Sequence, residues 1–206
     1  MNYAILIDAG YFSKVSNLIL KNYDKSIIEN LIKHIQTNVF PSDQLYRIFY
    51  YDSAPCTSTI INPIDNSAID FSKTPMFAKN TKLLEDIKSI PMLALRLGKI
   101  ATPKNSWEIK NIKTINGTTP IKAKQIKPKI NQKGVDMKIG LDIASISLKK
   151  QASKIILIAG DTDFVPVIKF ARSEGVQIFI STLKKYCSPS LIEHSDEVIN
   201  IDLTSI

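Results

Sequence analysis

The chain is poor in the residues that bind metals through sulfur or imidazole. It has two cysteines, Cys56 and Cys187, and two histidines, His34 and His194, and each pair is widely separated in sequence. Neither pair has the close spacing of zinc ligands, so we do not expect a zinc site. Two isolated thiols without a disulfide framework are typical of a reduced protein, and we therefore expect a cytoplasmic location.

Long hydrophobic runs are also missing. No apolar stretch approaches the roughly 20 residues of a membrane-spanning helix, so we expect no membrane partner. The N-terminus opens directly on a strand-like run at Tyr3–Ile7, without the basic and apolar segments of a secretory leader, and we expect no leader. A phosphate-binding P-loop sequence is absent as well, which counts against a P-loop nucleotide-binding protein.

Acidic residues are scarce in one part of the chain, residues 99–133. This segment holds nine lysines and one acid, Glu108, so its net charge of +8 equals that of the whole protein. Concentrated positive charge indicates a polyanionic partner such as a nucleic acid. The alternative is that a chain rich in isoleucine, lysine and asparagine simply uses lysine as its default exposed residue.

The stretch IILIAGDTDF, residues 155–164, is the most informative one present. Residues 155–159 are continuously apolar, as in a parallel strand that is buried on both faces. Gly160 permits a sharp exit from this strand, and Asp161 and Asp163 follow. One aspartate can cap the next helix, but two so close repel each other unless a cation, a proton or water screens them. The pair is therefore either a ligand site or a helix cap with a solvated neighbour.

The same pattern occurs at the start of the chain. Tyr3–Ile7 is a second apolar run, and it ends at Asp8 before a helical pattern. Two parallel strands that both end in carboxylates indicate a shared site at that edge of the sheet. Asp136 lies in the first turn of a predicted helix, where the helix dipole also favours an acid. Asp52 follows the aromatic strand 44–51, and a turn residue is favoured there over a further site acid.

Apolar strands alternate with amphipathic helices, which predicts a single α/β domain over residues 1–206 with a mainly parallel sheet. Residues 53–78 have no clear period and are predicted to form a loop insertion. Residues 99–133 are predicted to form a basic β-hairpin insertion with its turn at Asn116-Gly117. The expected helices are residues 11–19, 26–39 (capped by Ser26), 81–90, 134–150 and 164–174, and the expected strands are residues 3–7, 44–51, 92–97, 155–159, 176–181 and 198–201.

Four acids are candidates for one metal site, namely Asp8, Asp136, Asp161 and Asp163. They converge above the sheet if the first strand and the strand at 155–159 are neighbours, and a bare cluster of four carboxylates is unstable. Mg²⁺ or Mn²⁺ would remove the repulsion, because these hard cations prefer oxygen ligands. A carboxylate-held divalent cation suits hydrolysis of a phosphodiester, and a basic aromatic hairpin beside it suits a single-stranded polyanion.

Three segments resemble the NYN domain family of PIN-like nucleases, and within it the LabA-like branch: LIDAGY at 6–11, QKGVDMKIGLDI at 132–143 and AGDTDFVPVIKFARSEG at 159–175. The resemblance implies a three-layer α/β/α, Rossmann-like fold. It also implies divalent-metal-dependent cleavage of RNA, with Asp8, Asp136, Asp161 and Asp163 as the metal-site and catalytic acids. The chain departs from many relatives at Tyr11, where they carry asparagine.

Other side chains are second-tier candidates. Thr162 lies between the two aspartates and can orient a water or a phosphate, although capping of the next helix is slightly favoured. Asp142 matches an acid of the LabA-like branch, lies on the apolar side of its helix and therefore needs a buried partner. Ser181 ends a buried strand. The candidates for nucleic-acid contacts are Lys122, Lys124, Lys127, Lys129, Lys133 and Trp107.

The sequence predicts a ribonuclease that acts on single-stranded RNA or on structured RNA with single-stranded parts, but it leaves other functions open. A catalytically inactive NYN module that binds RNA or a protein, with a regulatory role, would keep the acids for structural reasons. The lysine-rich face could also contact a second subunit, which leaves a homodimer open. A haloacid-dehalogenase-type phosphatase is disfavoured, because Ala9 and Gly10 follow Asp8 where that class needs a second aspartate.

Overall fold

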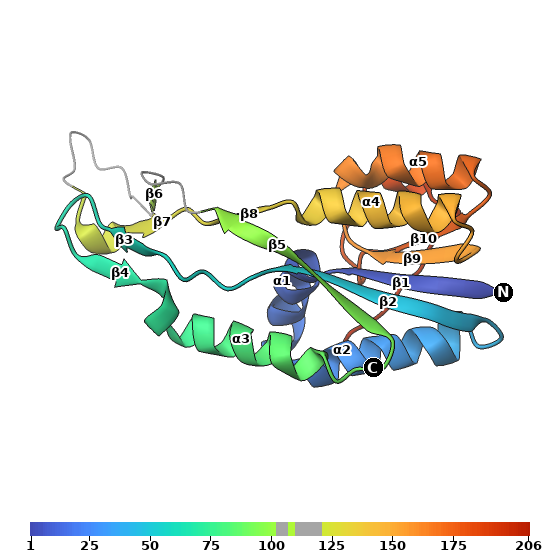
Figure 1. Ribbon diagram of the computed structural model, residues 1–206, viewed down its shortest axis with the longest axis horizontal. Helices are drawn as coiled ribbons and strands as arrows, with labels where there is room; N and C mark the ends of the chain where they lie inside the picture. The colour runs from blue at the N-terminus through green and yellow to red at the C-terminus, as the bar shows by residue number, and fades with distance from the viewer. Residues whose placement is uncertain (102–106, 110–120) are drawn as a thin grey trace.

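The computed structural model describes residues 1–101, 107–109 and 121–206 of the chain. Its centre is a seven-stranded sheet in the order β11-β10-β9-β1-β2-β5-β8 (Figure 1). Neighbouring strands are parallel except for β5 and β8, which are antiparallel. The prediction of a mainly parallel α/β sheet is therefore confirmed. The strands are β1 (Asn2–Asp8), β2 (Gln44–Ser53), β5 (Leu93–Ala101), β8 (Asn131–Lys133), β9 (Lys154–Ile158), β10 (Gln177–Ser181) and β11 (Glu197–Val198).

The parallel strands follow the doubly wound order. The chain starts at β1 in the middle, moves outward through β2 and β5, and then returns to the other side of β1 for β9, β10 and β11. The change of direction falls between β1 and β9, which pair directly from Tyr3 with Lys154 to Ile7 with Ile158. Ligands of such sheets bind at this point, outside the carboxyl ends of the two strands.

Helices cover both faces of the sheet, which gives three layers (Figure 1). The alternation of side chains along β1 feeds two cores: Tyr3, Ile5 and Ile7 pack on one face, and Ala4 and Leu6 pack on the other. The first core is closed by α1 (Ala9–Leu20), α2 (Lys25–His34) and α3 (Pro75–Ile87), and the second by α4 (Val135–Leu148), α5 (Val165–Ser173) and α6 (Pro189–His194). Within the described ranges, no helix combines the length and the apolar character that crossing a bilayer requires.

The helix predicted at 26–39 differs from the expectation at both ends. It starts at Lys25, and its cap is Asp24, whose Oδ1 accepts a hydrogen bond from the Ile27 amide at 3.2 Å. The predicted cap, Ser26, instead donates its hydroxyl to the same carboxylate at 2.6 Å. An ionised carboxylate accepts more strongly than a hydroxyl, so it takes the capping position. The last turn is a π-helix at Ile35–Val39.

The two predicted insertions pack together into a projection, called the arm below and made of the described residues of 54–73 and 107–130 (Figure 1). The segment predicted as a loop contains an antiparallel pair, β3 (Thr59–Ile61) and β4 (Ala68–Asp70), and a 3₁₀ helix, η2 (Phe71–Lys73). The basic segment contains η3 (Ala123–Gln125) and two antiparallel strands, β6 (Trp107–Ile109) and β7 (Ile126–Pro128).

A side-chain amide joins the two parts of the arm, since Asn62 Nδ2 donates to the Ala123 carbonyl at 3.3 Å. The predicted turn at Asn116-Gly117 lies outside the described residues, so the complete hairpin stays a prediction. Lys99 pairs with Lys133 where β5 meets β8, and this pairing connects the arm to the main sheet.

Candidate functional site

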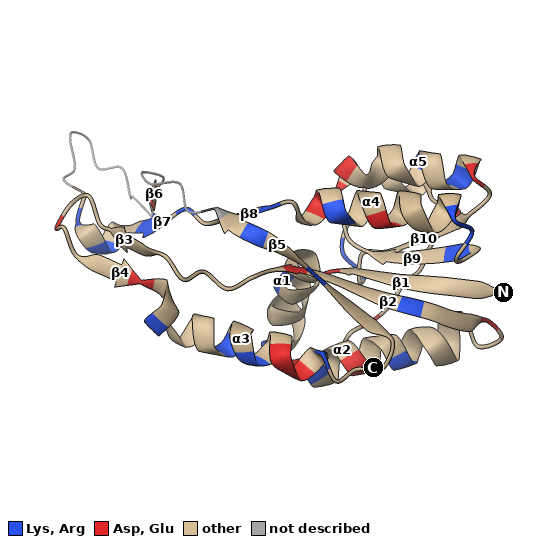
Figure 2. Ribbon diagram, in the orientation of Figure 1, with Lys and Arg blue, Asp and Glu red and all other residues tan. Residues whose placement is uncertain are grey.

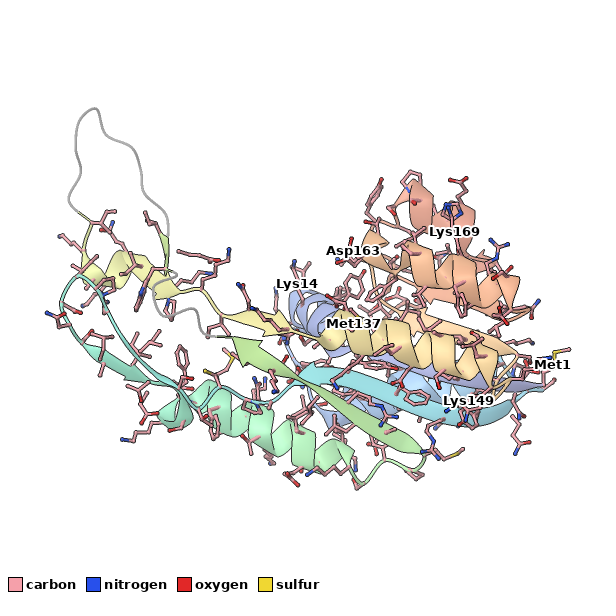
Figure 3. The ribbon with its side chains drawn as sticks, turned by 45° about the horizontal axis from the view of Figure 1, so that its top comes forward. Met1, Lys14, Met137, Lys149, Asp163 and Lys169 are labelled. Atoms are coloured by element: carbon pink, nitrogen blue, oxygen red, sulfur yellow. The ribbon has the colours of Figure 1, made fainter. Side chains whose placement is uncertain are left out.

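The candidate site lies at the carboxyl ends of β1 and β9. Asp8 is the last residue of β1, and its Oδ1 caps α1 by accepting from the Tyr11 amide at 3.2 Å. Asp161 follows β9, and its Oδ1 accepts from the Asp163 amide at 2.9 Å at the start of η4 (Thr162–Phe164). In Figure 3, Lys14, Met137 and Asp163 lie toward this end of the sheet, and Met1 lies at the opposite end.

Asp8 and Asp161 line the same open hollow, called the acid pocket below, which has a volume of about 420 Å³. Its other lining residues are Gly10, Tyr11, Lys14, Gly160 and Thr162. Two carboxylates from neighbouring strands and one lysine from α1 therefore share a solvent-accessible space. This combination can hold a cation between the acids and an anionic group beside the lysine.

The other two predicted acids line a second hollow. Asp136, in the first turn of α4, and Asp163 border a space of about 260 Å³. Burial raises the pKa of Asp136, and the nearby charges of Asp161 and Asp163 raise it further. The acids therefore influence one another electrostatically but are divided between two hollows. Across the described ranges 1–101, 107–109 and 121–206, no three His, Cys, Asp or Glu side chains are grouped closely enough to hold one metal ion.

Asp52 was assigned to a turn on sequence grounds, and the structure corrects this. It lies inside β2, and its Oδ1 accepts from the Ser53 amide at 2.7 Å and from Gln132 Nε2 at 3.4 Å. Burial raises the pKa of Asp8 to about 6, and the charges of Asp136 and Asp52 contribute to the rise. Burial also raises the pKa of Asp52. The sequence signal that could have identified Asp52 as a site residue is its position at the end of a strand, the same feature that identified Asp8.

Tyr11 forms one wall of the acid pocket and is fixed at both ends. Its amide bonds Asp8, and its hydroxyl donates to the Thr182 carbonyl at 2.8 Å. Its ring lies against Gly160, where an added Cβ would be 2.5 Å from Tyr11 Cε2. Burial raises the pKa of Tyr11 to about 12, with smaller contributions from Cys187 and Asp8. Gly160 is therefore required by close packing, whereas the glycines with positive φ in the described chain are Gly134 and Gly175.

Gly160→Ala is expected to destabilise the protein by about 1–3 kcal/mol, because the new methyl group overlaps the Tyr11 ring and displaces it from its hydrogen bond to Thr182. In a Tyr11→Ala background the same substitution should cost much less, because the obstructing ring is gone. Urea unfolding of the four proteins in this double-mutant cycle measures the coupling. If Gly160→Ala destabilises both backgrounds equally, the Tyr11 ring is not the reason that position 160 requires glycine.

The structure separates the three second-tier residues. Thr162 is exposed in the acid pocket, and the prediction that it caps the helix is wrong because Asp161 provides the capping oxygen. Ser181 is fully buried at the end of β10, and its Oγ accepts from the Leu183 amide at 3.4 Å. Thr162 therefore remains available to a ligand, whereas Ser181 has an internal contact.

Asp142 has the internal partners that its position required. Its Oδ2 accepts from the Tyr51 hydroxyl at 2.9 Å and from Arg96 Nε at 3.0 Å, which ties α4 to β2 and β5. Burial raises the pKa of Tyr51 well above its ordinary range, and the Asp142 charge adds to this. The phenol therefore remains a donor, and the carboxylate supports the helix that carries Asp136.

Asp142→Ala is expected to lower the free energy of unfolding by about 1–3 kcal/mol, because it leaves the buried Tyr51 hydroxyl without its acceptor. Asp142→Asn retains an oxygen at this position and should cost less. Thermal unfolding gives the stability order, and turnover per folded molecule should be unchanged in both variants. A stable Asp142→Asn protein with lost turnover would instead give this residue a role in the site.

The predicted nucleic-acid contacts lie on or next to the arm, where the basic residues that Figure 2 shows along β7 and β8 are lysines. Lys122, Lys124 and Lys129 are exposed, and Lys133 ends β8 and is separated from α4 by Gly134 alone. Two of the candidates have partners inside the arm: Lys127 Nζ lies 2.9 Å from Glu108 Oε2, and the half-buried Trp107 pairs with Pro128.

The doubly wound fold and the acids at its switch point define a class of α/β proteins, and comparison with known proteins identifies the family. Residues 64–202 match the NYN domain, so the chain belongs to the NYN family, a PIN-like nuclease family. The match includes Asp136, Asp142, Asp161 and Asp163, and it begins after β1 and β2.

A solved structure supports the fold over a longer range. The crystal structure of VPA0982, a protein of unknown function from Vibrio parahaemolyticus, has a TM-score of 0.53 and 16% sequence identity, and the similarity covers 98% of this chain and 93% of that one. No curated protein matches the chain. The structural similarity therefore reports on architecture, and the nuclease relationship rests on the NYN match.

Proposed function

We propose that the protein is a cytoplasmic, divalent-metal-dependent ribonuclease of the LabA-like branch that hydrolyses phosphodiester bonds in RNA. The observation that carries the proposal is the acid pocket, where Asp8 and Asp161 from adjacent parallel strands share one hollow with Lys14. Asp136 and Asp163 border the adjoining hollow. An open α/β sheet binds its ligand at this position, and NYN membership makes a nuclease the reaction class.

The residues present fit Mg²⁺ or Mn²⁺. Carboxylate oxygens are the preferred donors of these cations, and Mg²⁺ commonly takes only one or two carboxylates and completes its shell with water. Asp8 and Asp161 would hold the ion, and Asp136 and Asp163 in the adjoining hollow would contribute through water. Bound there, the ion would activate a water and neutralise charge on the scissile phosphate. Burial raises the pKa values of Asp8 and Asp136, with smaller contributions from the charges of neighbouring acids, and a bound cation would offset both effects.

The chain's own groups around the acids have separate tasks in this proposal. Lys14 Nζ attracts a phosphate oxygen into the acid pocket, and the exposed Thr162 hydroxyl can donate to a second one. The Tyr11 ring, held by Thr182, keeps the wall of the pocket rigid. Asp142 has a structural task, since it fixes α4 to the sheet through Tyr51 and Arg96.

The arm would bind the RNA backbone. The quadruple variant Lys122→Ala, Lys124→Ala, Lys127→Ala and Lys129→Ala is expected to flatten the slope of log affinity against log salt by up to about three, because each neutralised phosphate of a single strand releases about 0.7 of a counterion. Fluorescence anisotropy with single-stranded RNA measures the slope. If the variant binds RNA with the parent's affinity and the parent's salt slope, the lysines instead keep the protein soluble or contact another subunit.

A binding module without catalysis is the second candidate, favoured by the division of the acids between two hollows. Labelled single-stranded RNA incubated with Mg²⁺, Mn²⁺ or EDTA distinguishes the two. Cleavage that requires either ion and stops in EDTA supports the nuclease. Tight RNA binding with no turnover under any of the three conditions identifies the binding module.

A further inference from the structure

A groove of about 560 Å³ between α1 and α3 lies beside the acid pocket. Gly10 lines both spaces, so they meet at this residue. An added Cβ at Gly10 would lie 3.1 Å from Gln132 Oε1 and 3.3 Å from Asp8 Oδ1. The Gln132 amide and the Asp8 carboxylate therefore pack closely against this glycine at the border between the two spaces.

We propose that this space, called the α1–α3 groove, holds the single strand of nucleic acid that runs from the acid pocket toward α3. The inference rests on the proposed function, because it takes the acid pocket as the place of cleavage. It adds a binding track that is distinct from the lysine-rich arm, and it names the side chains that line it.

The chemistry of the lining matches a single strand. Asn17 on α1, Lys79 and Asn80 on α3, and Gln132 on β8 supply amide and ammonium donors along the groove. Such groups bind phosphate oxygens, sugar hydroxyls and base edges. Lys79 and Asn80 are exposed, so their donors are available to a ligand.

The negative charge is confined to one end of the groove. Asp52 lines it next to Gly10 and accepts a hydrogen bond from Gln132 Nε2. A phosphate would be repelled there unless a cation sits between the acids, whereas it would be attracted at the Lys79 end. This gradient orients a strand with one phosphate near the acid pocket and the next ones along α3.

The groove also offers apolar surface for a sugar or a base. Met76 lines it and is 69% exposed, and Leu83 and Tyr23 lie deeper. The Tyr23 hydroxyl is already paired with the Tyr50 hydroxyl at 2.5 Å, so its ring is a fixed surface. A flexible methionine and a fixed ring beside amide donors accommodate different bases without selecting one strongly.

The test compares RNA affinity in matched α3 variants. Anisotropy of fluorescein-labelled single-stranded RNA is measured in EDTA for the parent, the double variant Lys79→Ala/Asn80→Ala and the control Lys82→Ala. Lys82 is exposed on the same helix but lies outside the described lining of the groove. We expect the double variant to bind at least about fivefold more weakly with a salt slope lower by about 0.7, and the control to bind within twofold of the parent.

Each outcome bears on a different statement. If the parent binds and cleaves RNA and the double variant binds like the parent, the groove inference is overturned and the proposed function stands. If the double variant loses affinity and the parent binds without cleaving, the groove is supported and the nuclease fails. A parent that does not bind RNA overturns both.

A second measurement tests the groove without relying on the double variant, in case that variant does not fold. The parent is photo-crosslinked to RNA that carries 4-thiouridine, and the attached peptides are mapped by mass spectrometry. Crosslinks in α1 or α3 peptides support the groove. Crosslinks found only in the arm, or an affinity equal for RNA and for an unrelated acidic peptide, overturn it.

Discussion

Asp161→Asn is expected to reduce metal-dependent RNA cleavage by at least about 100-fold while the protein stays folded. The substitution removes a carboxylate charge from the acid pocket. It keeps an oxygen that can accept from the Asp163 amide, as Asp161 Oδ1 does at 2.9 Å, and asparagine caps helices about as well as aspartate. The loss of turnover therefore isolates the charge from the cap. Single-turnover cleavage with Mn²⁺ in excess measures the effect.

The same variant should be more stable than the parent without metal and should gain less stability from Mn²⁺. The Asp161 charge contributes to the raised pKa of Asp136, so removing it relieves repulsion. An ion that binds only the folded state raises the free energy of unfolding by RT ln(1 + c/Kd), where c is the concentration of free ion, so a weaker site gives a smaller gain. Thermal unfolding with EDTA and with Mn²⁺ compares the two proteins. An unchanged Mn²⁺ shift would exclude Asp161 from the metal site.

Asp24→Asn is the matched control for this experiment. Asp24 also caps a helix with a carboxylate oxygen, at 3.2 Å from the Ile27 amide, and it lies outside the described lining of both hollows. The control should cleave RNA at the parent's rate and show the parent's Mn²⁺ shift. Equal losses in Asp24→Asn and Asp161→Asn would mean that the effect comes from capping.

In metal-free protein, Asp8→Asn is expected to become more stable than the parent as the pH rises from 4 to 7, by up to about 3 kcal/mol. Burial raises the pKa of Asp8 from its ordinary value of 3.8 to about 6 in the folded protein. The folded state therefore binds this proton more tightly than the unfolded state does. Ionisation of Asp8 costs folding free energy between these two pH values, and the full cost is present at pH 7.

Urea unfolding in EDTA at several pH values tests this expectation. Other acids change the stability with pH in the opposite direction. Partners such as Lys184 lower the pKa of Asp202, and Lys154 lowers that of Asp43. These groups therefore add stability as the pH rises through their own lower pKa values. These contributions are common to both proteins and cancel in the difference. A difference in stability that stays constant from pH 4 to 7 would contradict the buried, repelled state of Asp8.

Addition of Mn²⁺ should reverse the trend in the parent. The ion requires an ionised carboxylate, so its affinity is expected to rise through pH 6 as Asp8 loses its proton. The parent then regains at neutral pH the stability that the ionised acid costs in EDTA. Asp8→Asn lacks this proton and should show a flatter dependence of Mn²⁺ affinity on pH.

The sequence by itself determined the class of fold and the two strand ends at which the candidate site lies. Strands buried on both faces read as continuous apolar runs, so residues 155–159 and Tyr3–Ile7 could be assigned without a structure. Parallel strands present their carboxyl ends at one edge, which is why Asp8 and Asp161 were paired in the prediction. The structure places them in one hollow, and their role as metal ligands stays a prediction.

Only the tertiary structure decided which side chains meet. A local pattern encodes the backbone conformation, but the distance between Asp52 and Gln132, or between Asp142 and Arg96, depends on strand order and on the packing of helices far apart in the chain. The same holds for Gly160, whose sequence context indicated a turn although its need comes from the Tyr11 ring. Contacts of this kind join segments that are far apart in the chain. No local periodicity specifies the relative position of such segments, because the packing of the two cores on either face of the sheet sets that position.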